Sequence, residues 1–210
     1  VIVGKSVNII GENKTGTILD RTYYGGYAFI IQANDVVVTN FTIRQSDGVD
    51  IYGAKNVTIY GCIIEGGTII CDNSQNIVFF DNELPQMFIE ESTCSVHNNS
   101  FINYDYIHIW RSDCSIRNNS FGYYGGIEIR GWYLEDFIQD IEDNDILGKP
   151  IYYFLNQSGM VIDNWDVGQL ILVNCNDFEI KNLSISYASA AIEIAYSSNI
   201  NITENAISNS

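Results

Sequence analysis

Four ionisable side chains of this 210-residue chain each stand between two aliphatic residues in a short alternating segment: Asp50, His108, Glu128 and Glu193. We expect these four side chains to point outward and stack in one file. Tyr52, Trp110 and Arg130, two positions further on in three of the segments, should form a neighbouring file. Aromatic faces beside carboxylates and an arginine suit a sugar ring, because rings stack on its C–H face and polar groups bond its hydroxyls. We therefore expect a glycan-binding face formed by His108, Trp110, Glu128, Arg130 and Trp132.

The same residues have two other interpretations. A pair of acids such as Glu128 and a neighbour from the next turn could act as general acid and base on a glycosidic bond. Alternatively, aromatic side chains stack on a parallel sheet for stability, and Glu128 and Arg130 make ordinary surface contacts. We assign no catalytic residue from the sequence.

The elements that position these residues follow a repeat of about twenty residues. Its unit has an aliphatic residue, then Asn two or three positions later, then an aliphatic or aromatic residue. The clearest copies begin at Val38, Val96, Ile116 and Ile180, and looser copies begin at Ile59, Phe79, Ile141 and Ile202. A period of this length indicates a solenoid.

Alternating apolar residues around each copy predict strands with one buried face. A second alternating strand follows within each turn, as in Ile107 with Ile109 and Ile127 with Ile129. The segments are too short, too β-branched and too rich in Asn and Gly for stacked helices. The sequence therefore predicts an all-β, single-stranded parallel β-helix of roughly nine to ten turns, in one domain spanning residues 1–210. The repeat runs to Ser210, so we expect no cap at the C-terminal end and either a longer parent protein or end-to-end pairing of copies.

The asparagines of the repeat have a structural and a covalent interpretation. Asn and Gly tolerate the left-handed conformation of a sharp corner, so we expect inward amides that bond to one another at Asn40, Asn98, Asn118 and Asn182. Asn-x-Ser/Thr sequons, which are candidate N-glycosylation sites, begin at Asn13, Asn40, Asn56, Asn98, Asn118, Asn156, Asn182 and Asn201. A structural corner would select the same pattern without any glycan.

Two irregularities and five cysteines depart from the regular repeat. The spacing from Ile116 to Ile141 predicts a loop inserted around residues 131–137, and residues 148–150 interrupt the next turn.

Cys94 and Cys114 occupy the same inward position one turn apart, which predicts stacked core thiols. We favour free thiols there, because parallel Cβ directions would strain a disulfide. An exposed cysteine elsewhere could join chains covalently.

Composition limits the possible partners. The chain has 26 acidic and 10 basic residues, a net charge of −16, which argues against nucleic acid and anionic membranes. Acidity for solubility outside the cell is the simpler explanation, with calcium binding as the alternative. We expect no membrane span, because no apolar stretch is long enough.

Several segments resemble one known fold family. Residues 7–20 (VNIIGENKTGTILD) look like the opening turn of pectin-lyase-like right-handed parallel β-helices. Residues 148–154, 168–175 and 192–199 are similar to the NosD-like branch, which is abundant on archaeal cell surfaces. The resemblance implies a right-handed β-helix and an extracellular or cell-surface location. This fold hosts enzymes, adhesins and structural proteins, so it leaves the function open.

The residues that such relatives would use for chemistry are missing from the sequence. It lacks the Gly-His-Gly and Arg-Ile-Lys motifs of polygalacturonases, the Asp-Pro-His of alginate epimerases and the Arg-x-Pro-x-x-Arg of pectate lyases. Copper, which the name NosD suggests, would require clustered His, Cys or Met. The chain offers only His97, His108, Met87 and Met160, with no ligand spacing. We therefore expect no metal site and no cofactor.

Two functions remain open from the sequence alone. The leading hypothesis is a non-catalytic structural or adhesive component of a cell envelope, with other copies of itself or other envelope proteins as partners. The alternative is a module that binds or cleaves polysaccharide through the face defined above.

Overall fold

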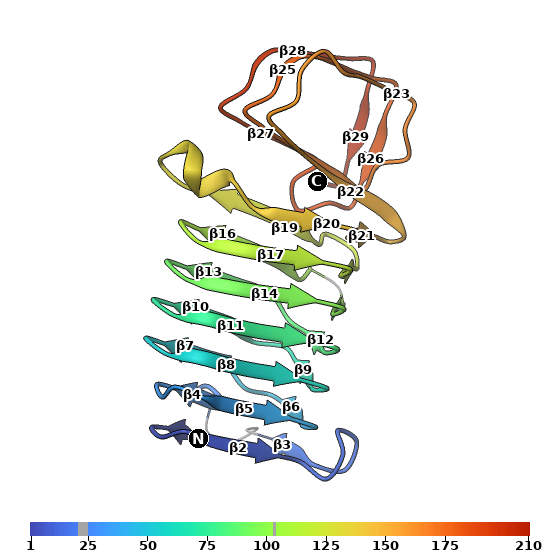
Figure 1. The fold of residues 1–210 in the computed structure, drawn as a ribbon. Helices are drawn as coiled ribbons and strands as arrows, with labels where there is room; N and C mark the ends of the chain where they lie inside the picture. Colours follow the sequence, from blue (N-terminus) through green and yellow to red (C-terminus); the bar gives the residue numbers. More distant parts are fainter. Residues whose placement is uncertain (21–24, 103) are drawn as a thin grey trace.

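The computed structural model describes residues 1–20, 25–102 and 104–210 as an all-β parallel solenoid of about nine turns (Figure 1). The predicted fold class is confirmed. Each turn of residues 1–146, the N-terminal segment, contributes one strand to each of three sheets. Successive turns therefore stack as parallel strands, as the period of the repeat predicted.

The three sheets are named A, B and C. Sheet A contains β1 (Ile2–Val3), β4 (Phe29–Ile31), β7 (Gly48–Tyr52), β10 (Thr68–Asp72), β13 (Met87–Glu90), β16 (Tyr106–Trp110) and β19 (Gly126–Arg130). Sheet B contains β2 (Val7–Ile10), β5 (Val36–Thr39), β8 (Lys55–Tyr60), β11 (Gln75–Phe80), β14 (Thr93–His97), β17 (Asp113–Arg117) and β20 (Asp140–Glu142). Sheet C begins with β3 (Ile18–Asp20), β6 (Thr42–Arg44), β9 (Ile63–Glu65), β12 (Glu83–Leu84), β15 (Ser100–Phe101), β18 (Ser120–Phe121) and β21 (Asp145–Ile146).

The core lies between these sheets and follows the alternation of the sequence. Ile107 and Ile109 of β16 are buried, as are Ile127 and Ile129 of β19, whereas the residues between them face outward. Branched aliphatic side chains fit this arrangement because they pack well on a pleated, half-buried surface.

The thiols lie in this core. Cys94 and Cys114 are register partners on β14 and β17, and both are buried. A hydrogen bond with the Cys71 thiol, together with burial, raises the pKa of Cys94, and burial raises the pKa of Cys114. All five cysteines lie in the described part of the chain, and each is free and buried. The structure therefore places no cysteine where it could join chains covalently.

The asparagine corner differs in one respect from the sequence-based expectation. Asn40, Asn98, Asn118 and Asn182 all have left-handed backbones, with φ of 64°, 57°, 55° and 56°. However, Asn98 and Asn118 are exposed, and their successors Asn99 and Asn119 are 3% and 1% exposed. At this corner the left-handed residue points outward and the next one points inward. In the turns of Asn98 and Asn118, the inward amide therefore lies one residue later than the sequence predicts.

The inward amides form a continuous ladder between sheets B and C. The Nδ2 groups of Asn82, Asn99 and Asn119 each donate to the Oδ1 atom of the asparagine in the following turn, at 3.0, 3.1 and 3.0 Å. The last acceptor is Asn144. After Asn40 and Asn182 the inward residues are Phe41 and Leu183, so those turns are closed by apolar packing.

The expected insertion is present between β19 and β20. Residues 131–138 leave the solenoid and include a short 3-10 helix, η1 (Leu134–Phe137). Asp136 accepts hydrogen bonds through Oδ2 from the backbone N–H groups of Trp132 and Tyr133, at 2.7 and 2.9 Å. This carboxylate fixes the conformation of the loop that carries Trp132.

The solenoid changes direction where residues 148–150 interrupt the repeat. Strand β22 (Lys149–Leu155) pairs antiparallel with β21, and sheet C continues with β24 (Gln169–Val173) and β27 (Ile192–Ala195). The remaining strands form two small sheets, the first with β23 (Val161–Asp163), β25 (Asn176–Lys181) and β28 (Ser198–Thr203) and the second with β26 (Ser184–Ser186) and β29 (Ala206–Ser208).

Residues 149–210, the C-terminal segment, lie across the end of the N-terminal segment (Figure 1). All five residues of β24 are buried, whereas a strand such as β16 alternates between buried and half-buried positions. Gln169 of β24 bonds the backbone of Ile127 in the N-terminal segment. Because side chains alternate along a strand, one face of β24 packs on the N-terminal segment and the other on the C-terminal core. The C-terminal segment thus covers the β19 edge of sheet A.

Candidate functional site

The outer face of sheet A brings four of the five expected face residues together. His108 and Glu128 are register partners on β16 and β19, as are Trp110 and Arg130. The Nδ1 atom of His108 lies 3.8 Å from Oε2 of Glu128. Their side chains point outward because the aliphatic residues on either side of them fill the core.

The insertion brings the fifth residue, Trp132, to the same place. Its ring packs edge-on against Trp110, with centroids 5.8 Å apart, and the guanidinium of Arg111 lies 4.7 Å from its centroid. Trp132 remains 60% exposed despite these contacts. An indole held on two sides and open to solvent is a preorganised stacking surface.

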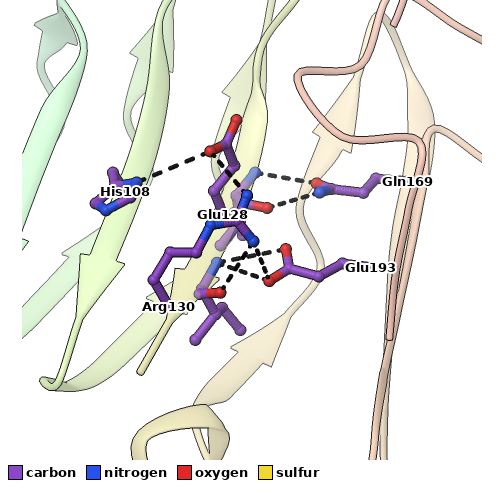
Figure 2. Close-up of polar contacts among 7 residues, drawn as sticks. His108, Glu128, Arg130, Gln169 and Glu193 are labelled. Carbon is purple, nitrogen blue, oxygen red and sulfur yellow. Dashed lines mark hydrogen bonds and ion pairs between the residues drawn. The ribbon is translucent and has the colours of Figure 1, made fainter. Parts of the chain in front are cut away.

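Arg130 lies between two carboxylates (Figure 2). Its Nη2 atom is 3.6 Å from Oε2 of Glu128, and its Nη1 atom is 3.3 Å from Oε1 of Glu193. Glu193 comes from β27 of the C-terminal segment and is 8% exposed. The expectation that it stands in one outward file with Asp50, His108 and Glu128 is therefore wrong. Glu193 faces the end of sheet A because the C-terminal segment has turned across that end.

Burial dominates the electrostatics of Glu193. Loss of solvent raises its pKa to about 7 from the usual 4.5, and the negative charge of Glu128 acts in the same direction. Arg130 and the backbone N–H of Ile129 oppose the rise because both stabilise the carboxylate. A carboxyl group that titrates near neutral pH is a feature that functional sites share with some structural ones.

A hollow of about 290 Å³ opens beside these residues. Its lining includes Trp110, Arg130, Glu193 and Tyr196, so both segments contribute to it. The Tyr196 hydroxyl donates to the backbone carbonyl of Trp132 at 2.6 Å and thereby ties the C-terminal segment to the insertion.

Sequence analysis did not identify Tyr196 or Gln169 as part of this site. The available signal for Gln169 was a polar residue opening a run of four apolar residues. For Tyr196 there was none, because its contact with Trp132 depends on the change of direction after β21.

A second hollow of about 410 Å³ has Arg111 and Thr93 in its lining. Arg111 donates to Oε1 of Glu91 at 2.6 Å, so its charge is already balanced. Asp113, Glu135 and Asp136 also line this hollow and make it acidic. Residues of the insertion therefore line both hollows: Gly131 and Phe137 the first, and Glu135 and Asp136 the second.

The arrangement supports binding better than acid–base chemistry. Glycosidases need a carboxylic acid at the glycosidic oxygen and a second carboxylate free to act on the sugar or on water. Here Glu193 accepts from Ile129 and Arg130, and Glu128 contacts Arg130 and His108. Both carboxylates are held by protein partners, whereas the aromatic faces are open.

The sequon asparagines lie mostly at the surface. Asn13, Asn56, Asn98, Asn118, Asn156, Asn182 and Asn201 are exposed, and Asn40 is half-buried. Some of their side chains already bond to neighbours: Asn56 Nδ2 donates to Asp35, and Asn182 Nδ2 donates to Asp163, both at 2.8 Å.

No group of three or more His, Cys, Asp or Glu side chains in the described part of the chain is arranged to hold a metal ion. Within the same residues, no helix has the length and apolar character needed to cross a bilayer. Comparison with protein-family models, curated proteins and solved structures found no match to this chain.

Proposed function

We propose that this protein is a non-catalytic, extracellular β-solenoid that acts as an adhesive element of a cell envelope by binding saccharide chains. The binding site is the junction face, which we define as His108, Trp110, Glu128, Arg130, Trp132 and Tyr196. The observation that carries the proposal is the exposed Trp132 ring, which Trp110 and Arg111 hold in place. Each of these two partners also lines a hollow. A saccharide chain can stack on this ring and place a neighbouring unit in the hollow that Trp110 lines.

Charge favours an uncharged saccharide as the ligand. Arg111 is paired with Glu91, and Arg130 lies between Glu128 and Glu193, so neither guanidinium is free to bind a uronate. The chain as a whole carries a net charge of −16, which repels polyanions. We therefore expect neutral chains to bind and uronate chains to be excluded.

The proposed location has two supports. The eight sequons are typical of an exported protein, and seven of their asparagines are exposed. The segments at residues 148–154, 168–175 and 192–199 resemble the NosD-like branch of pectin-lyase-like β-helices, which is abundant on archaeal cell surfaces. Envelope proteins or other copies of the chain fit as further partners of such a solenoid.

Binding to a panel of soluble polysaccharides tests the proposal. Neutral glucans, mannans and xylans should retard the protein in affinity electrophoresis, and polygalacturonate and alginate should not. Trp132→Ala should weaken binding by about 5- to 30-fold, because stacking of one ring contributes on the order of 1–2 kcal/mol. Tyr52→Ala is the matched control, since Tyr52 is also an exposed ring on sheet A, at 52%.

Three outcomes would contradict the proposal. Failure of the whole panel to bind would remove saccharide binding, and preferential binding of uronates would overturn the ligand class. Release of new reducing ends from a bound polysaccharide would show that the protein is an enzyme. In that case Glu128 and Glu193 become the first residues to substitute.

A further inference from the structure

The two segments meet through side chains that take the place of a strand. The backbone N–H of Ile127 donates to Oε1 of Gln169 at 3.0 Å, and Nε2 of Gln169 donates to the Ile127 carbonyl at 2.6 Å (Figure 2). Two residues further along β19, the N–H of Ile129 donates to Oε1 of Glu193 at 3.1 Å. The primary amide of Gln169 thus satisfies both backbone groups of its partner, as a neighbouring strand would.

Glu193 completes this contact less well than Gln169 does. An ionised carboxylate only accepts hydrogen bonds, so it cannot donate to the Ile129 carbonyl. That carbonyl instead receives a 3.4 Å contact from Nη1 of Arg130. A protonated carboxyl group would have both a donor and an acceptor, as an amide has. The protonated form therefore matches the edge of β19 better.

The charged groups around Glu193 come from several elements. Strand β19 supplies Arg130 and Glu128, and β16 supplies His108, which lies beside Glu128. The insertion carries Glu135 and Asp136, and β24 has no ionisable side chain. Tyr153 of β22 is in register with Ile171 of β24, which is in register with Glu193. Arg130 is the one cation among these groups that contacts Glu193 directly.

We propose that docking of the C-terminal segment on sheet A is proton-dependent and that Glu193 is the group that senses pH. The inference goes beyond glycan binding and holds whether or not the junction face binds a saccharide. Docking forms the hollow that Arg130 lines from one segment and Tyr196 from the other. Protonation of one buried side chain would therefore control whether this part of the surface is assembled.

The direction of the pH dependence of docking follows from the burial of Glu193. The pKa of Glu193 is raised to about 7 in the docked protein, and exposure on undocking returns it toward 4.5. Docking is therefore strongest at low pH and weakens as pH rises from 4.5 through 7. Over the interval from pH 5.5 to pH 8, the undocking equilibrium should increase about 25-fold from this group alone.

Hydrogen exchange of the Ile127 and Ile129 amides in the full chain measures this equilibrium. After correction for intrinsic exchange rates, protection of Ile129 should fall about 25-fold between pH 5.5 and pH 8. Glu193→Gln should abolish the fall and raise protection at pH 8 above the wild-type value, because an amide at 193 can repeat the contact of Gln169. Equal wild-type protection at both pH values would overturn the proposal.

Two further variants keep the test decisive. His108→Gln should leave the pH dependence of Ile129 intact, and its loss in that variant would make His108 the sensor and overturn the assignment. Gln169→Glu should create a new pH dependence at Ile127, because it places a second carboxyl group on the same sheet edge. A thermal melt by circular dichroism confirms that each variant is folded before exchange is measured.

Discussion

Adjacent asparagines in this chain have opposite environments at the same corner. Asn118 has a left-handed backbone and is exposed, whereas Asn119 is buried. The Asn119 amide donates to Val96 O and Asn144 Oδ1, and its Oδ1 accepts from the Asn99 backbone and side chain. We predict that Asn119→Ala destabilises the protein by about 2–4 kcal/mol, because it leaves several buried polar groups unpaired. Urea denaturation measures the loss.

Asn118→Ala provides the matched control one residue away. It removes an exposed side chain and puts a Cβ-only residue in the left-handed region, which costs roughly 1 kcal/mol. A similar loss of stability in both variants would contradict the assignment of the ladder to the inward residues.

The insertion between β19 and β20 is the element that gives sheet A its exposed indole. The Asp136 carboxylate holds the backbone of Trp132 and Tyr133, so it sets the position of the Trp132 ring. Asp136→Ala should loosen residues 131–138 at a cost of about 1–2 kcal/mol, since two charge-assisted hydrogen bonds are lost. Limited proteolysis should then cut the insertion faster, and saccharide affinity should fall.

Glu135→Ala is the comparison for this element, because Glu135 lies beside Asp136, is exposed and leaves the Trp132 backbone contacts intact. An equal increase in cleavage for both variants would mean that the negative charge of the insertion holds it in place, and not the hydrogen bonds of Asp136.

Local pattern predicted much of this fold, and the limits of that prediction have a physical cause. Period-two alternation gives the strands, and the long spacing from Ile116 to Ile141 gives the insertion, because both depend on residues near in sequence. The pairing of His108 with Glu128 follows from the same repeat. Glu193 and Tyr196 were not predictable, because their contacts depend on the antiparallel β21–β22 pair that redirects the chain. No periodic pattern in the sequence predicts the angle at which the C-terminal segment lies across the N-terminal segment.

At the scale of the whole molecule, the buried residues of both segments form one hydrophobic cluster, and β24 belongs to it. Gln169 faces the N-terminal segment, so Ile171, two residues along the same strand, shares that face and is 1% exposed. Leu170 and Leu172 face the other way, toward the C-terminal core, and are also buried. The packing of the two segments against each other should make them unfold together, since neither can expose β24 without losing buried area from both.

Substitution of the two faces of β24 separates docking from folding of the C-terminal segment. Ile171→Ala should lower the free energy of unfolding by about 2–4 kcal/mol, because it leaves a buried cavity. It should also split the expected single calorimetric transition into two, because it weakens only the contact between the segments. Leu172→Ala should cost a similar amount and lower the stability of the C-terminal core itself. If Ile171→Ala retains one transition with a loss below about 1 kcal/mol, the segments are not coupled through β24. The proton-dependent docking at Glu193 would then lack the apolar contact that it is expected to modulate.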